Sequence, residues 1–130
     1  MIVKGTFELT MTPEPAYDDA DGVSLARARF EKRYAGPLEA TSQMNMIGVR
    51  TPVDGSAGYV GVERVVGTLE GKRGAFVLQH SGIMTRGQRS LSVTIVPDSG
   101  TGELKGVAGR MDIQIVEGKH HYELDVSLGG

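Results

Sequence analysis

The stretch YVGVERVVGTLEGKRGAFVLQHSG, residues 59–82, decides the fold because two apolar runs flank one short turn signal within it. Both runs alternate with a period of two, which is typical of β-strands. We predict an antiparallel hairpin with Gly71-Lys72 as its two-residue loop, since glycine at the first position permits a type II′ turn. In that register the side chain of Glu63 lies directly opposite that of His80.

The two faces of this hairpin are both largely apolar. The face with Glu63 and His80 also has Gly61 beside Gly82, which leaves space next to the acid and the imidazole. The opposite face carries Val60, Val62, Val66, Val77 and Ile83. If the first face lines an interior, the second must be covered, because large exposed apolar patches are rare on monomers. We therefore predict a homodimer.

Turn signals divide the whole chain into eight such runs. These signals are DDADG (18–22), AGP (35–37), TPVDGS (51–56), EGK (70–72), TRG (85–87), PDSGTG (97–102) and EGK (117–119). None of the runs shows the 3.6-residue apolar period of a helix. Eight antiparallel strands in an up-and-down meander leave exposed edges unless the sheet closes. We predict one all-β domain over residues 1–130, an eight-stranded antiparallel barrel, with a β-sandwich as the alternative.

Composition argues against several classes of function. The chain has a net charge of −2 and no tryptophan, which disfavours a nucleic-acid partner. The cluster of Arg27, Arg29, Lys32 and Arg33 is interpreted as a solvated strand face. The first residues, MIVKGTFELTM, resemble neither an export signal nor a membrane span, so we expect no membrane partner. A chain without cysteine fits a reducing, cytoplasmic location.

The sequence lacks the patterns of metal sites and of common hydrolases. His120 and His121 are adjacent in a predicted strand, so their side chains point to opposite faces and cannot chelate one ion together. There is no cysteine and no His-x-His or His-x-x-x-His spacing. A Gly-x-Ser-x-Gly nucleophile elbow is also missing. We expect neither a metal nor a cofactor.

Four segments in a fixed order carry a family resemblance. They are GTFEL (5–9), DDADG (18–22), residues 59–82 and SGTGELKGVAGR (99–110), followed by a closing strand with His and Tyr. Through them the chain resembles, over nearly its whole length, a bacterial family classed as a domain of unknown function with an allene-oxide-cyclase-like barrel. The resemblance implies an eight-stranded barrel and no particular reaction. The positions that match its pattern are Glu63, Arg64, Gln79, His80 and Gly82.

Three functions fit this barrel. The first is binding of an unidentified small, mainly apolar molecule in the lumen. The alternatives are a cofactor-free isomerase or cyclase, in which Glu63 and His80 are the catalytic acid–base pair, and a structural or partner-binding barrel that uses its outer face. The candidate ligand-binding residues are Tyr59, Gly61, Arg64, Gln79, Gly82, Met44, Met46 and Tyr122.

Overall fold

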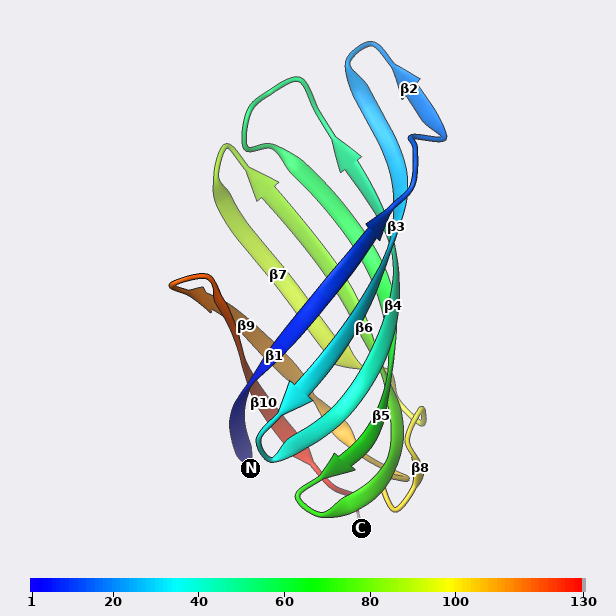
Figure 1. Cartoon of the computed structure of the whole chain (residues 1–130), viewed down its shortest axis with the longest axis vertical. Helices are drawn as coiled ribbons and strands as arrows, with labels where there is room; N and C mark the ends of the chain where they lie inside the picture. Colours follow the sequence, from blue (N-terminus) through cyan, green and yellow to red (C-terminus); the bar gives the residue numbers. More distant parts are fainter. Residues whose placement is uncertain (130) are drawn as a thin grey trace.

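The computed structural model describes residues 1–129, in which every regular element is a β-strand (Figure 1). The strands are β1 (Ile2–Pro13), β2 (Asp18–Ala20), β3 (Val23–Ala35), β4 (Leu38–Arg50), β5 (Ala57–Leu69), β6 (Lys72–Thr85), β7 (Gln88–Ile95), β8 (Thr101–Gly102), β9 (Ala108–Val116) and β10 (Lys119–Ser127). Eight are long, and their boundaries follow the predicted turn signals. The short β2 pairs antiparallel with the first residues of β3, and the short β8 pairs with β6.

The eight long strands close into one antiparallel barrel, as predicted, rather than a sandwich. Neighbouring strands follow the order β1-β10-β9-β7-β6-β5-β4-β3. Strand β1 closes the circle, because its first half pairs with β10 and its second half with β3. Closure removes the free edges that an open sheet would expose. No helix in the described residues could span a membrane.

The predicted register of the β5–β6 hairpin is wrong by two residues. The loop is Glu70-Gly71 rather than Gly71-Lys72, and Leu69 pairs with Lys72. Both loop residues have positive φ, 50° at Glu70 and 79° at Gly71. Two positive φ angles define a type I′ turn, whose twist matches that of the flanking strands. Three other turns of this chain follow the same pattern, with a non-glycine residue before the glycine: Asp21-Gly22, Arg86-Gly87 and Glu117-Gly118.

The even size of this shift preserves the faces of the hairpin. Glu63 is paired with Leu78, and His80 is paired with Gly61. Glu63 and His80 are therefore diagonal neighbours instead of direct partners, but both still point into the barrel. Phe76 pairs with Val65 on the same face.

The barrel interior is solid in one half and hollow in the other. Large inward side chains fill the lower half, where Leu104 and Val107 of the β7–β9 connection close the bottom. In the upper half several inward positions carry small residues, among them Ala26, Gly48, Ala57 and Gly82. One cross-strand row there reads Ala26, Gly48, Tyr59, Gly82 and Leu91. Small residues on a narrow ring leave unfilled space, so the upper lumen is a cavity.

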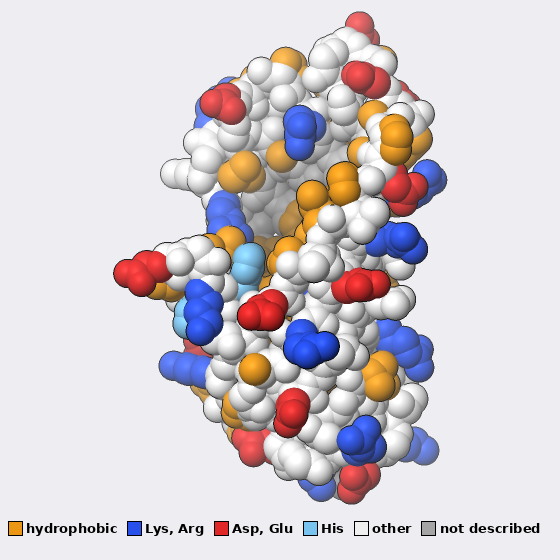
Figure 2. All heavy atoms as spheres, viewed as in Figure 1, with side chains coloured by type: hydrophobic (Ala, Val, Ile, Leu, Met, Phe, Trp, Pro, Cys, Tyr) orange, Lys and Arg blue, Asp and Glu red, His pale blue; other side chains and the backbone are white. Residues whose placement is uncertain are grey.

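The barrel wall is also incomplete beside this cavity. Strands β7 and β9 pair through only two residue pairs, Val93 with Met111 and Thr94 with Arg110. Above them the β9–β10 hairpin turns away from β7 (Figure 1). Figure 2 shows the resulting hollow in the upper half of the molecule, edged by hydrophobic side chains. The cavity is therefore accessible from solvent.

The outward face of β4, β5 and β6 carries the apolar patch that the alternation predicts. We call it the valine face, and it consists of Ile47, Val60, Val62, Val66 and Ile83. Val60 and Val62 are each 55% exposed and Ile83 is 57% exposed. Val77, which was predicted on the same face, is half-buried. A patch of this kind is expected on a surface that has a partner.

Candidate functional site

The centre of the barrel contains a fully buried carboxylate. Glu63 has no exposed surface and accepts four hydrogen bonds from side chains on three strands. Lys32 Nζ at 3.1 Å and His80 Nε2 at 2.7 Å contact Oε1. The Tyr34 hydroxyl at 2.5 Å and the Ser42 hydroxyl at 2.6 Å contact Oε2. Both carboxylate oxygens are thus saturated by protein donors.

Strand alternation explains why these donors converge. Lys32 and Tyr34 occupy inward positions of β3, and Ser42 pairs with Lys32 from β4. The interpretation of Lys32 as part of a solvated basic face is wrong, because only 4% of its side chain is exposed. Arg29 and Arg33 do point outward. Phe30, Lys32 and Tyr34 alternate with charged residues along β3, and this alternation in the sequence indicates that the lysine points inward.

The network keeps Glu63 ionised. Burial acts to raise the pKa of its carboxyl group, but hydrogen bonds from His80, Ser42 and Tyr34 and the charge of Lys32 outweigh it and lower the pKa to about 2. Burial, and then the negative charge and hydrogen bond of Glu63, raise the pKa of Tyr34 well above its usual value, whereas a hydrogen bond with Ser42 acts to lower it. A carboxylate that remains charged and saturated cannot donate a proton. Its chemical role is to hold the lysine and to orient the imidazole.

One atom of this cluster remains without a partner. His80 is 1% exposed, and its Nδ1 is the only buried side-chain nitrogen or oxygen in residues 1–129 that forms no hydrogen bond. Because Nε2 contacts an ionised carboxylate at 2.7 Å, Nε2 carries a proton. In the neutral imidazole Nδ1 then has a free lone pair. It could accept a hydrogen bond or a proton.

The Tyr59 ring separates this histidine from the cavity. Tyr59 and Gly82 are direct partners across β5 and β6, and a Cβ at Gly82 would lie 2.4 Å from the Tyr59 ring. Only glycine therefore lets the ring lie flat against the wall. The ring centroids of Tyr59 and His80 are 6.4 Å apart. Tyr59 forms part of the cavity floor, and His80 lies in the row beneath it.

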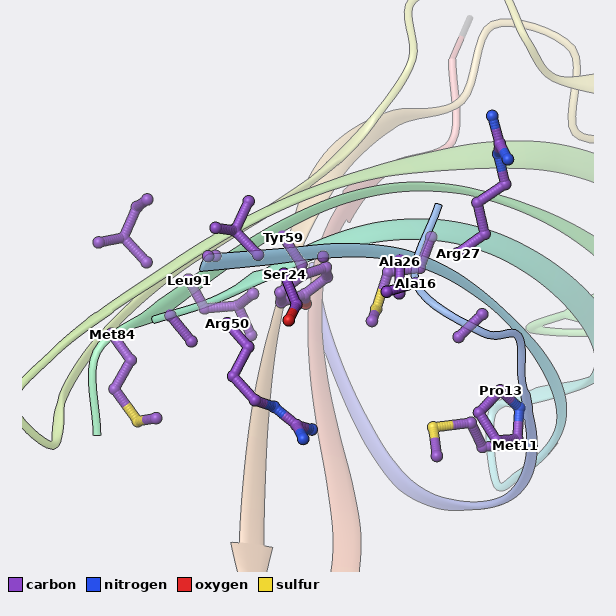
Figure 3. Close-up of a pocket in the computed structure, with 18 of the residues that line it drawn as sticks. Met11, Pro13, Ala16, Ser24, Ala26, Arg27, Arg50, Tyr59, Met84 and Leu91 are labelled. Atoms are coloured by element: carbon purple, nitrogen blue, oxygen red, sulfur yellow. The ribbon is translucent and has the colours of Figure 1, made fainter. Parts of the chain in front are cut away.

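The cavity above this floor has a volume of about 600 Å³ (Figure 3). Most of its lining is apolar: Met11, Pro13, Ala16, Ala26, Ala28, Met46, Val49, Ala57, Met84 and Leu91. Polar groups at its wall include Ser24, Tyr59 and Ser90. A volume in the range of about 300–1,000 Å³ with a few polar groups is typical of small-molecule sites.

The structure brings three of the predicted ligand-binding residues to this cavity and places the others elsewhere. Tyr59, Gly82 and Met46 line it. Met44 and Gly61 are buried below it, where the Met44 sulfur would lie 3.2 Å from a Cβ at Gly61. Lining residues that the sequence reasoning missed include Arg50 and Arg89.

Tyr122 lies at the opposite end of the barrel from the cavity. It is 2% exposed, and its hydroxyl accepts a hydrogen bond from the Leu38 amide at 3.0 Å and lies 3.2 Å from the Ala35 carbonyl oxygen. Burial raises the pKa of this hydroxyl. Tyr122 thus ties β10 to the β3–β4 turn and closes the bottom, so it does not orient a ligand in the upper cavity.

Arg64 and Gln79 point outward. Both are exposed, and they lie on the face opposite Glu63 and His80, as the alternation of β5 and β6 requires. Arg64 borders a shallow outer groove with Glu31 and Arg33. Neither side chain reaches the lumen. Within residues 1–129, no group of three or more His, Asp or Glu side chains is arranged to hold a metal ion.

Comparisons with known proteins agree with the fold. A family described as "Protein of unknown function (DUF3224)" matches residues 3–126. A crystal structure of a protein of unknown function from the same family, from Shewanella oneidensis MR-1, is 49% identical and superimposes with a TM-score of 0.94. That match covers 98% of this chain and 96% of the other chain. No curated protein matches the chain.

Proposed function

The chain belongs to the DUF3224 family, whose description assigns no function, and from the geometry of its own residues we propose that it binds a small, mainly apolar molecule in the upper lumen. The observation that carries this proposal is the division of the barrel. The lower half is filled with large side chains, whereas small residues leave a cavity of about 600 Å³ above Tyr59. A barrel filled along its whole length would instead have large side chains at inward positions such as Ala26, Gly48 and Gly82.

The chemistry of the wall supports an apolar occupant. Aliphatic side chains and thioethers from β1, β3, β4, β5, β6 and β7 contribute most of it. Met11, Met46 and Met84 are among them, and unbranched thioethers adapt to ligands of irregular shape. Burying a ligand's apolar surface here releases water from both partners, which contributes about 25 cal/mol per Å² of apolar surface.

Titration with N-phenyl-1-naphthylamine tests the proposal. This neutral probe fluoresces when it leaves water, so we expect a saturable rise in its emission with the wild-type protein. Ala26→Leu and Gly48→Val each add side-chain volume inside the cavity and should abolish the rise. At Gly48 the nearest obstacle to a new Cβ is the flexible end of Met46 at 3.3 Å. Ala108→Leu, at an exposed position of β9, is the control. Equal binding by all four proteins would overturn the proposal.

A second candidate, a cofactor-free isomerase or cyclase, is favoured by one observation. His80 is oriented by an ionised Glu63 and has an unpartnered Nδ1, as a general base requires. For Nδ1 to reach a molecule in the cavity, the Tyr59 ring would have to move. Proton–deuterium exchange into a bound substrate, lost in His80→Gln and retained in Tyr59→Phe, would support this candidate. Exchange unchanged in His80→Gln would exclude it.

We also propose that the valine face pairs with a second copy of the chain in the cytoplasm. In a two-fold dimer the same patch meets itself, so charged residues at its centre would repel their own copies. The outward neighbours of Val60 and Val62 on β4 and β6 include the uncharged Asn45, Gln79 and Ser81, whereas the charged Arg64 lies away from this centre, between Val62 and Val66 on β5. Depletion of charge at the centre is characteristic of interface cores.

A further inference from the structure

The mouth of the cavity carries two arginines in one row. The register links Ser24 to Arg50, Arg50 to Ala57, Ala57 to Met84, and Met84 to Arg89. These positions form the inward row directly above Tyr59 and Gly82. Three strand spacings separate Arg50 from Arg89, about 14 Å along the sheet. Because the sheet curves around the lumen, both side chains can turn toward the same space.

Neither guanidinium has an acidic partner. Within residues 1–129 the ion pairs are those of Glu63 with Lys32 and His80 and of Met1 with Asp125. Glu14 is the one carboxylate among the lining residues. The third lining arginine, Arg27, lies over the Tyr17 ring at 4.7 Å, and Figure 3 shows it pointing away from Arg50. The mouth therefore has excess positive charge on Arg50 and Arg89.

Arg89 also lies close enough to act on the tyrosine of the floor. Burial raises the pKa of the Tyr59 hydroxyl, and the positive charge of Arg89 acts against this rise. The two side chains thus bracket the same part of the cavity wall, one below and one at the mouth. The guanidinium group at the mouth supplies the donors that a carboxylate, sulfonate or phosphate accepts.

Resting on the proposed function, we infer that the ligand is an amphipathic anion, a small apolar body with a single acidic group. The apolar body lies against the small-residue rows, with Tyr59 beneath it. The acidic group lies at the mouth, where Arg50 and Arg89 neutralise it. This arrangement leaves the charge near water and so avoids the cost of burying an ion in the lumen.

A pair of matched probes separates this inference from the proposal on which it rests. N-phenyl-1-naphthylamine and 8-anilinonaphthalene-1-sulfonate share one aromatic body and differ by the sulfonate. We expect the sulfonate to bind about tenfold more tightly, as one charge-assisted contact at a partly exposed mouth provides. The preference should shrink as salt increases, because added ions screen charges that face solvent.

Arginine substitutions then identify the groups responsible. Arg50→Gln and Arg89→Gln should each weaken sulfonate binding several-fold more than they weaken binding of the neutral probe, and the double variant should remove the preference. Arg29→Gln, an exposed arginine of β3 outside the cavity, is the control. Equal affinity of the wild type for both probes, or a preference that survives in the double variant, would overturn the inference and leave the cavity proposal standing. Failure of both probes to bind would overturn both.

Discussion

Glu63 and His80 meet at 2.7 Å inside the barrel although they are two residues out of register on adjacent strands. The diagonal contact works because the residue opposite His80 is Gly61, which has no side chain to intervene. Lys32 approaches the same carboxylate oxygen from β3. The arrangement is a buried charge network at the boundary between the solid and hollow halves of the barrel.

Removing the charge of Glu63 should be strongly destabilising. Glu63→Gln leaves the buried ammonium group of Lys32 without its counterion, and breaking a buried pair in this way typically costs about 3–5 kcal/mol. In the double variant Glu63→Gln/Lys32→Met the uncompensated charge is gone. We expect its free energy of unfolding in urea to exceed that of Glu63→Gln. If the double variant loses as much free energy of unfolding as Glu63→Gln and Lys32→Met lose together when measured singly, the two charges do not interact. Glu31→Gln, exposed on β3, is the control.

The stability of the protein should fall in acid because of Glu63. Its pKa in the folded protein is about 2, below the ordinary value of 4.5, so the folded state binds this proton less readily than the unfolded chain. The contribution amounts to about 3 kcal/mol, is fully present above about pH 4.5 and is lost as the pH falls toward about 2. Urea denaturation at a series of pH values measures it. Below pH 4.5 the free energy of unfolding of the double variant Glu63→Gln/Lys32→Met should depend less steeply on pH than that of the wild type. An identical dependence in the two proteins would contradict the assignment to Glu63.

The tautomer of His80 is open to direct observation. Its Nε2 should carry a proton that is shared with Glu63, and Nδ1 should be bare. Long-range ¹H–¹⁵N correlation spectra of the histidine side chains distinguish these nitrogens by their ¹⁵N shifts. His121, which is partly exposed on β10, provides an internal reference. A proton on Nδ1 with a bare Nε2 would be incompatible with the short contact to an ionised carboxylate.

The valine face should control association. Val62→Lys puts a charge at its centre, and two copies would then bring like charges together. We expect the wild type to sediment as a dimer at micromolar concentration and Val62→Lys to sediment as a monomer with unchanged circular dichroism. Thr10→Lys, on the exposed face of β1, should remain dimeric. A wild type that sediments as a monomer would contradict the proposed dimer.

The strand pattern could be predicted from the sequence because alternation and turn residues act locally. The register of β5 and β6 could not, since Gly71 permits either a type II′ turn with Lys72 or a type I′ turn with Glu70. The predicted faces of the hairpin are nevertheless correct, because the two registers differ by an even number of residues. The prediction for Lys32 is wrong because it relies on the charge of the residue. The alternation of Lys32 with Phe30 and Tyr34 places its side chain inward.

The site was only partly visible for a related reason. The register between neighbouring strands decides which inward residues share a level of the barrel, and therefore which end of the lumen is hollow. This register places Tyr59 in the cavity and Tyr122 at the opposite end. Arg50 and Arg89 lie 39 positions apart in sequence order but in one cross-strand row of the barrel. No local motif connects them. Arg64 and Gln79 were transferred from a family pattern although their alternation already placed them outside.

A crystal structure of the complex with 8-anilinonaphthalene-1-sulfonate would decide whether the lumen binds the ligand, because this probe could also settle on the valine face. We expect the aromatic body inside the upper lumen against Tyr59, with the sulfonate at the mouth between Arg50 and Arg89. A probe bound on the outer surface of β5 and β6, with the lumen free of it, would contradict the account.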